Sequence, residues 1–442
     1  MKNYQAHIIH VGSMNNKGAQ ALLKTDFLIL KSALKNIDVS VSTTDISGVN
    51  DLNLPFKSVV SPFIDVPYET ADLISKKKGY FRFSLRHKLL GVSCFFNMFI
   101  QILLSVISAF MVSIGLKAIY RNEVFERIKE CDVVVSCSDE NFKENASLFS
   151  LNFTWRFAWW SMLFSRTCDV LIAKFLGKKV VMFPNSIGPF QTWVGKVFSK
   201  LALGNFECIL AREGVSFSVV KNLNVGAKII RTSDSALLYA GLQGISKVIP
   251  SKNSIGVCLG LYSHVLDDGE VRKQISSYAK VLDEVIEKFD FNVVFLPHYI
   301  NGFRYDDLET SQLVMDKMKN KDSISLVNVS SVDEFTKHLG GMNMVVSSKM
   351  HPAVIATSMC VPTFCIAYDQ KQTGFFNDLE LSECLVCVKD VCADNFRSKI
   401  NYVWNNQEKI ADQLNNKIPA LKNITKDSIE LVLKSMLQGA GD

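Results

Sequence analysis

The sequence lacks the short motifs that most directly identify a nucleotide cofactor or a structural metal. It contains neither GxGxxG nor GK[ST], so a nicotinamide-dinucleotide site and a Walker-type ATP site receive little support. The nearest approach to a zinc pattern is Cys384, Cys387 and Cys392, which have no second ligand pair and no histidine close by. We therefore predict no metal and no cofactor.

The sequence also lacks a large excess of positive or negative charge. The formal net charge of the 442 residues is +6. Such a mild excess does not favour nucleic acid as a partner, but it is compatible with anionic ligands or a membrane surface.

A secretory signal and an oxidising compartment are not indicated. The first residues, "MKNYQAHIIHVGSMNNKG", have no long apolar core. The eleven cysteines are odd in number and lie mostly in apolar runs, which is typical of reduced, buried thiols. We expect the protein in the cytoplasm.

What the sequence does contain is an alternation of short β-branched runs and helical stretches. In the first half the runs include "AHIIHV", "DVVVS", "KKVVMFP", "CILAR" and "AKIIR"; in the second half they include "SIGVCLG", "NVVFLP", "MVVSS" and "PTFCIAY". Continuous apolar runs separated by helices indicate parallel strands that are covered on both faces.

We therefore predict an α/β fold with two doubly wound, Rossmann-like domains. Residues 1–240 form the N-terminal domain, and a stretch of Gly, Pro, Ser and Lys at 241–254 forms the linker. Residues 255–442 form the C-terminal domain, with helices from about 390 to 437 packing back. Ligand sites in such folds lie at the carboxyl ends of the strands, which places the active site in the interdomain cleft.

One uncharged segment, residues 91–116, does not fit this alternation. It is long enough to span a membrane, but a span would separate strands that look like parts of one sheet. Polar residues at helical spacing (Ser93, Asn97, Gln101, Ser105 and Ser108) and the preceding lysines and arginines favour a helix at the membrane interface, on the inner face of the cell membrane. A buried core or dimer helix is the alternative.

The stretch "VVSSKMHPAVIA" predicts a strand, then a turn with Lys349 and His351, then a helix with Pro352 in its first turn. A lysine, an imidazole and helix N–H groups that point to one spot favour a phosphate or carboxylate ligand. A solvated lysine and a capping histidine are the alternative.

Other predicted strands also end in polar groups. These are Arg212 with Glu213, Asn185 with Ser186, and His298. Near the N-terminus, "HVGSMNNKGAQALL" predicts a strand, a turn with Asn16 and Gly18, and a helix start that offers backbone N–H groups to a polar ligand.

The order of these pieces resembles the polysaccharide pyruvyl transferase family, whose members look like two-domain glycosyltransferases of the B type. The resemblance rests on "NNKGAQALL", "DVVVSCSDENF", "NSIGPF", "AREGVS", "SDSALL", "LPH" and "SSKMHPAVIA" with "VPTFCIAYDQK". It implies transfer of a pyruvyl group from phosphoenolpyruvate to sugar hydroxyls as a ketal, in cell-surface or exopolysaccharide biosynthesis. The acceptor would be a sugar or a polyprenyl-linked oligosaccharide.

The resemblance also implies roles for residues. Lys349, His351 and Arg212 would hold the phosphate and carboxylate of the donor. From the residues we infer general acid–base catalysis, in which His351 or a nearby acid assists proton delivery or departure of phosphate; His298, Glu213 and Glu140 are the candidates for the base of the sugar hydroxyl. Asn16, Gly18, Asn185 and Ser186 would contribute to substrate binding.

Two departures from the family pattern stand out. The family more often has arginine where this chain has Lys349, and lysine cannot make the planar bidentate contact of a guanidinium. The turn after Asp132 reads "SCSDENF" and has no glycine, where the family has a glycine-rich turn. The alternatives are a nucleotide-sugar glycosyltransferase of the same fold, or a non-catalytic membrane-surface partner in polysaccharide assembly.

Overall fold

The computed structural model describes residues 3–34, 36–65, 85–144, 153–250, 252–262, 266–300 and 306–437. The chain divides into two compact units. The first unit comprises Met1–Met14, Leu22–Asp234 and Thr425–Asp442, and the second comprises Asn15–Ala21 and Ser235–Ile424. Two helices, α1 (Lys17–Ala33) and α17 (Gln407–Leu437), therefore contribute residues to both units. The linker at 241–254 stays a prediction.

The first unit is built on an eight-stranded parallel sheet in the order β3-β2-β1-β4-β6-β7-β8, with β5 paired to β6. The predicted β-branched runs form strands, and those of β4, β6 and β7 are buried on both faces of the sheet, whereas β8 at its edge is half-buried or exposed. The strands are β1 (Tyr4–Ile9), β2 (Ile37–Ser42), β3 (Ser58–Val60), β4 (Val133–Ser136), β5 (Asp139–Phe142), β6 (Lys179–Ile187), β7 (Cys208–Ala211) and β8 (Lys228–Arg231).

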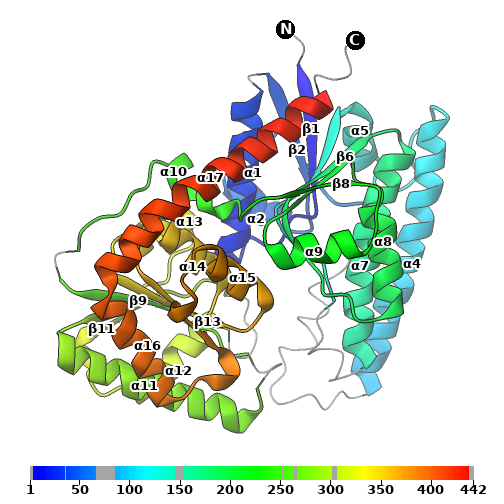
Figure 1. The fold of residues 1–442 in the computed structure, drawn as a ribbon. Coiled ribbons are helices and arrows are strands. Elements are labelled where there is room, and N and C mark those ends of the chain that lie inside the picture. Colours follow the sequence, from blue (N-terminus) through cyan, green and yellow to red (C-terminus); the bar gives the residue numbers. More distant parts are fainter. Residues whose placement is uncertain are drawn as a thin grey trace. The chain divides into compact units, whose positions relative to one another are not determined.

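Helices connect these strands. They are α2 (Ile46–Asp51), α4 (Leu85–Ser113), α5 (Asn122–Glu130), α7 (Phe153–Phe175), α8 (Trp193–Leu203) and α9 (Gly214–Asn222), besides most of α1 and the end of α17. Figure 1 shows α4, α7 and α8 side by side, with α7 packed against both of the others. We call α4, α7 and α8 the three-helix layer.

The second unit has a six-stranded parallel sheet in the order β11-β10-β9-β12-β13-β14. Its strands are β9 (Ser254–Cys258), β10 (Asn292–Phe295), β11 (Ile324–Leu326), β12 (Met344–Ser347), β13 (Thr363–Ala367) and β14 (Leu385–Cys387). The chain runs outward from β9 to β11 and then outward from β12 to β14 on the other side. The strand order therefore reverses between β9 and β12, which is the topological switch point of a doubly wound sheet.

The helices of the second unit pack in two groups. In one, α11 (Asp268–Phe289) contacts α12 (Asp307–Lys317) and α16 (Ala393–Asn405). In the other, α14 (Met350–Ser358) contacts α10 (Ala236–Leu242) and α13 (Val332–Gly340). Helix α15 (Gln370–Asp378) and short 3₁₀ turns at Lys321–Ser323, Ser382–Cys384 and Val388–Asp390 complete the unit. Two parallel-sheet α/β domains were predicted from the sequence, and the structure confirms them.

Candidate functional site

The switch point of the second unit gathers several of the predicted site residues. Lys349 follows β12, His351 lies in the first turn of α14, and His298 follows β10. Because β9, β10 and β12 are parallel neighbours, their carboxyl ends share one edge of the sheet. The loop after β9 brings Gly260 and Tyr262 to the same edge.

The ammonium group of Lys349 is held in place by an acid, an aromatic ring and a glycine. Nζ lies 2.8 Å from Oδ1 of the buried Asp307 and 5.3 Å from the centre of the Tyr262 ring. A Cβ at Gly260 would stand 2.5 Å from Nζ, so a larger residue there would displace the end of this lysine. Burial opposes the charge of Lys349, but the charge and hydrogen bond of Asp307 outweigh burial and raise its pKa.

His351 rests on the start of α1. A Cβ at Gly18 would stand 2.5 Å from Cγ of His351 and nearer still to Nδ1. The N–H of Gly18 donates to the side-chain oxygen of Asn16, and Asn16 forms a β-bridge with Tyr299. The predicted residues Asn16, Gly18, His298, Lys349 and His351 are therefore brought together within the second unit.

Lys17 belongs to the same cluster and was missed from the sequence. It lies between Asn16 and Gly18, its side chain is buried, and its ammonium group is 5.7 Å from the centre of the Phe335 ring. Burial lowers its pKa, and the charge of Asp307 partly opposes this. Its place in the middle of "NNKG", at the start of a helix, was the signal that could have identified it.

His298 is the buried polar group at the centre of this cluster. It is 3% exposed, and neither ring nitrogen has a hydrogen-bond partner among the described residues. Its ring stacks near His351, with 6.1 Å between the ring centres. Burial, and then the positive charges of His351, Lys349 and Lys17, hold the pKa of His298 well below its ordinary value.

This arrangement is chemically suited to an anion. Two lysines and a second histidine surround a buried imidazole. Asp307 is the only carboxylate among the groups that shift the pKa values of Lys17, His298 and Lys349. Helix α14 adds N–H groups, because Lys349 at its N-cap makes no side-chain cap. A buried imidazole whose nitrogens lack partners has its hydrogen-bonding capacity left for a ligand.

In the first unit, Arg212 and Glu213 lie in a buried polar network at the carboxyl ends of β6 and β7. Nη1 of Arg212 is 2.9 Å from Oδ2 of Asp234, and Nε donates to Ser186 Oγ at 2.6 Å. Glu213 accepts hydrogen bonds from Ser186 and Ser216. Burial raises the pKa of Glu213, and Arg212 partly opposes this. Asp234 was missed from the sequence, although it lies in "SDSALL".

The glycine-free turn after β4 is held by side chains instead. The carboxylate of Asp26 accepts from both N and Oγ of Ser138 at 2.7 Å. Asn185 donates to the Cys137 carbonyl at 2.9 Å and accepts from N of Asn141 at 3.0 Å. No residue of 136–142, all of them described, has a positive φ, so the backbone of this turn does not require glycine. Asn185 acts here as a support of the turn.

A second histidine site lies at the switch point of the first sheet, between β1 and β4, and was also missed. His10 has φ of 63°, a conformation that costs energy for any residue except glycine. Its Nδ1 is 2.9 Å from Ser136 Oγ, and its Nε2 is 3.5 Å from Oδ2 of Asp169. Burial lowers the pKa of His10 and raises that of Asp169, which favours neutral forms of both. Its position directly after β1 was the available signal.

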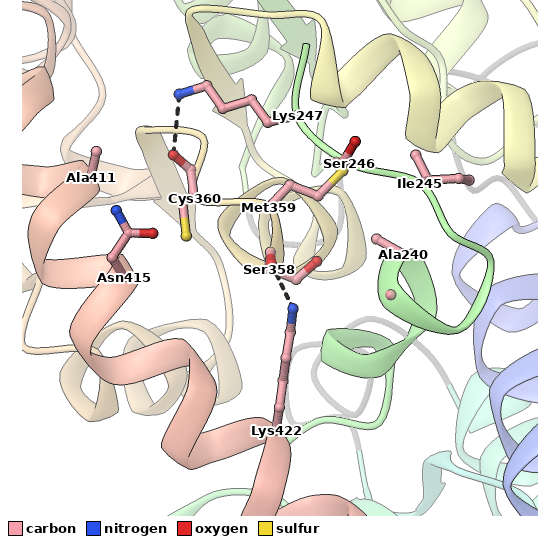
Figure 2. Close-up of a pocket in the computed structure, with 11 residues that line it drawn as sticks. Ala240, Ile245, Ser246, Lys247, Ser358, Met359, Cys360, Ala411, Asn415 and Lys422 are labelled. Carbon is pink, nitrogen blue, oxygen red and sulfur yellow. Dashed lines mark hydrogen bonds between the residues drawn. The ribbon is translucent and has the colours of Figure 1, made fainter.

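A pocket of about 450 Å³ lies elsewhere in the second unit, at the C-terminal end of α14 (Figure 2). Lys422 donates to the carbonyl of Ser358 at 2.8 Å, and Lys247 donates to that of Cys360 at 3.4 Å. These lysines satisfy carbonyls that the end of a helix leaves unpaired. The predicted donor residues are at the other end of α14, so this pocket is distinct from the cluster around His298.

The part of the chain that the structure describes contains no cluster of side chains suited to binding a metal ion. Within it, no group of three or more His, Cys, Asp or Glu residues has the arrangement of a metal site. The ten described cysteines are free thiols, of which Cys387 and Cys392 are exposed.

Comparison with known proteins gives one family and one fold. A model of the family described as polysaccharide pyruvyl transferase matches residues 7–370. The amylovoran biosynthesis protein AmsJ of Erwinia amylovora is 22% identical over 314 residues, which cover 67% of this chain and 71% of that protein.

Solved structures with the same fold include nucleotide-sugar epimerases. A putative UDP-N-acetylglucosamine 2-epimerase from Listeria monocytogenes has a TM-score of 0.62 at 10% identity, covering 98% of this chain and 96% of its own. MnaA of S. aureus, solved with UDP, has a TM-score of 0.59 at 11% identity, covering 98% and 97%. These neighbours confirm the predicted glycosyltransferase-B-like fold, and the active site between the two domains stays a prediction.

Proposed function

Because the chain belongs to the polysaccharide pyruvyl transferase family, we propose that it transfers a pyruvyl group from phosphoenolpyruvate to two hydroxyls of a sugar as a ketal. Membership in the family, and the similarity to an amylovoran biosynthesis protein, support a role in exopolysaccharide biosynthesis. The observation that carries the proposal is the cluster of Lys17, Lys349 and His351 around the buried His298.

Phosphoenolpyruvate fits the chemistry of this cluster. It is small and carries a phosphate and a carboxylate, so it needs more than one cation within a short distance. Lys17 and Lys349 supply two charges from different elements, and the start of α14 supplies N–H groups. His298 supplies a buried hydrogen-bonding group that no described residue uses.

The reaction balances without a metal or a redox partner. Each of the two sugar hydroxyls loses a proton and forms a C–O bond to C2 of the donor. The bond between C2 and the phosphate oxygen breaks, so that inorganic phosphate leaves. One of the two protons ends on the methylene carbon, which becomes a methyl group, and the other leaves with the phosphate.

His351 and His298 are the groups we assign to these proton movements. Protonation of the methylene leaves positive charge at C2, which the phosphate and carboxylate of the donor offset. A histidine that is neutral in the free protein gains a proton more easily once an anion lies beside it. His298 has that character, and His351 lies next to it.

The roles proposed for the first unit are less direct. The guanidinium of Arg212 is engaged by Asp234 and Ser186, and the carboxylate of Glu213 by two serine hydroxyls. Direct contact with a substrate would require some of these bonds to be exchanged. We therefore favour His298 over Glu213 as the base: once it has given the proton it gained to the methylene, its neutral imidazole accepts a proton from the sugar hydroxyl.

The test is release of phosphate from phosphoenolpyruvate with a panel of glycan and polyprenyl-linked sugar acceptors. We compare the wild type with His351→Ala and His298→Gln, and use His338→Gln, in the last turn of α13, as the matched control. Acceptor-dependent release that both site variants lose and the control keeps supports the proposal. Absence of both phosphoenolpyruvate binding and release with every acceptor refutes it.

A nucleotide-sugar glycosyltransferase is the second candidate. What favours it is the fold shared with MnaA, which was solved with UDP. It predicts that UDP binds and that UDP-sugars, not phosphoenolpyruvate, are consumed. The same panel with UDP-sugars as donors separates the two candidates, and turnover with neither donor favours a non-catalytic role.

A further inference from the structure

Exposed apolar side chains are concentrated on the three-helix layer of the first unit. Of the twenty large hydrophobic side chains that are exposed in the described part of the chain, fourteen lie on α4, α7, α8 or the turn at 114–119. Leu103 on α4 is 60% exposed, and Trp193 at the start of α8 is 77% exposed. Soluble proteins rarely concentrate apolar surface in this way unless something binds there.

The same three helices are rich in positive charge. Their sequences contain seven lysines and arginines and one acidic residue, Asp169, which is buried beside His10. Their excess of six positive charges equals the formal net charge of the whole chain, +6. Lys174 is paired with Glu207, whereas Lys196 and Lys200 on α8 are exposed.

Helix α8 alternates exposed lysines with exposed apolar residues. Trp193, Val197 and Leu201 follow one another at intervals of four, and Lys196 and Lys200 each precede an apolar member of this row. Residues four apart lie on one face of a helix. A face that mixes Trp, aliphatic residues and lysine is typical of helices at a membrane interface.

Helix α4 is long enough and apolar enough to cross a membrane, but one side of it belongs to the core. The window Phe96–Ser113 meets the length and composition of a span, and 33% of it is buried within the protein. The side chain of Gln101 accepts a hydrogen bond from N of Asp65 and donates one to the carbonyl of Asp65. Ser105 donates to the Phe63 carbonyl at 3.1 Å. Ser108 accepts from N of Tyr120 at 3.1 Å. Lipid therefore cannot surround this helix while the unit is folded.

We propose that the three-helix layer docks on a bilayer that contains anionic phospholipid, with α4 and α8 lying in the headgroup region. The apolar rows enter the boundary of the acyl chains, and Lys196 and Lys200 meet the headgroup phosphates. Of the two interpretations of segment 91–116, a membrane-interface helix and a buried core or dimer helix, this proposal selects the first. It also adds α8 to the membrane-binding surface, which the sequence did not indicate.

A second copy of the chain fits this surface less well. In a two-fold dimer the same patch faces itself, so the lysines of α8 would lie near their own symmetry mates, and the one acidic residue of the layer, Asp169, is buried beside His10 and does not offset them. An anionic bilayer offers the opposite charge.

The experiment is co-sedimentation of the full chain with vesicles of phosphatidylcholine alone or with added phosphatidylglycerol. The variants are Lys196→Gln with Lys200→Gln, and Phe99→Ser with Leu103→Ser. The matched controls are Lys389→Gln with Lys409→Gln, two exposed lysines of the second unit, and Ile249→Ser, an apolar side chain that is 89% exposed there.

We expect binding that requires phosphatidylglycerol. Loss of the two lysines lowers the partition coefficient by on the order of 25-fold, about fivefold for each charge, and the controls keep it. Circular dichroism of each variant shows that the chain is folded. Absence of binding to either vesicle overturns the proposal. So does a dimer in sedimentation velocity that Phe99→Ser with Leu103→Ser dissociates without any vesicle binding, because a second copy then covers the layer.

Discussion

The imidazole of His351 lies directly against the α-carbon of Gly18. A Cβ at that glycine would stand 2.5 Å from Cγ of the histidine, well inside van der Waals contact. Two motifs from opposite ends of the sequence, "NNKGAQALL" and "SSKMHPAVIA", thus form one surface in the second unit. The glycine is needed for close approach of the backbone to a ring, and its φ is not positive.

Gly18→Ala is expected to displace His351 and reduce turnover with phosphoenolpyruvate by about 100-fold, as a displacement of about 1 Å at a reacting group can do. Overpacking costs about 1–3 kcal/mol of unfolding free energy. Steady-state phosphate release and urea unfolding measure the two effects. Gly226→Ala, where a Cβ meets open space, is the control. Unchanged turnover in Gly18→Ala would show that the position of His351 does not matter to the reaction.

The architecture could be predicted well because the buried strands of this fold appear in the sequence as continuous apolar runs. Every quoted run became a strand, and the strands it missed, such as β3 and β14, have three residues each and almost no pattern to detect. It also predicted that Lys349, His351 and His298 meet, because parallel strands end at one edge.

What could not be predicted were partners that lie far apart in the chain. Asp307 begins α12 and pairs with Lys349, and Asp26 lies inside α1 and binds the turn at Ser138. Nothing in the local pattern of either acid distinguishes it from a solvated one. The turn without glycine stood out in the sequence as a departure from the family pattern, and the structure shows that side-chain hydrogen bonds shape it.

Lys349→Met is expected to lower both stability and turnover, because it leaves the carboxylate of Asp307 buried without its cation. Breaking a buried pair costs about 3 kcal/mol. The double variant Lys349→Met with Asp307→Asn should recover most of that stability but none of the turnover. Urea unfolding and phosphate release separate the structural contribution of the pair from its role in donor binding. Recovered turnover in the double variant would rule out a contact between Lys349 and the donor.

Binding of phosphoenolpyruvate is expected to take up a proton at His298. Burial and three neighbouring cations hold the pKa of this histidine well below its ordinary value in the free protein, so it is neutral at neutral pH. A bound anion offsets those cations and raises the pKa, so affinity increases as pH falls, by up to about tenfold per pH unit. Calorimetry in buffers of different ionisation enthalpy measures the uptake.

His298→Gln keeps a hydrogen-bonding side chain but cannot titrate, and it serves as the reference for this measurement. Protonation of the ligand itself contributes equally to both proteins, so the difference between them reports on the histidine. Equal proton uptake by wild type and variant would place the titrating group elsewhere.

Asp26 should make the first unit less stable as pH rises. Burial raises the pKa of this carboxyl to about 7, against 3.8 for the unperturbed group, although its hydrogen bonds from Ser138 oppose the shift. Between these values the folded protein keeps a proton that the unfolded chain has released. The contribution of Asp26 to unfolding free energy therefore falls by about 1.4 kcal/mol per pH unit across that window, and by up to about 4 kcal/mol in total.

Asp26→Asn keeps an acceptor for N of Ser138 and removes the titration, so its stability relative to wild type should rise from pH 4 to pH 8. Unfolding transitions across this range test it, with exposed Asp316→Asn as the control. A constant difference between wild type and Asp26→Asn would mean that the buried carboxyl is ionised throughout.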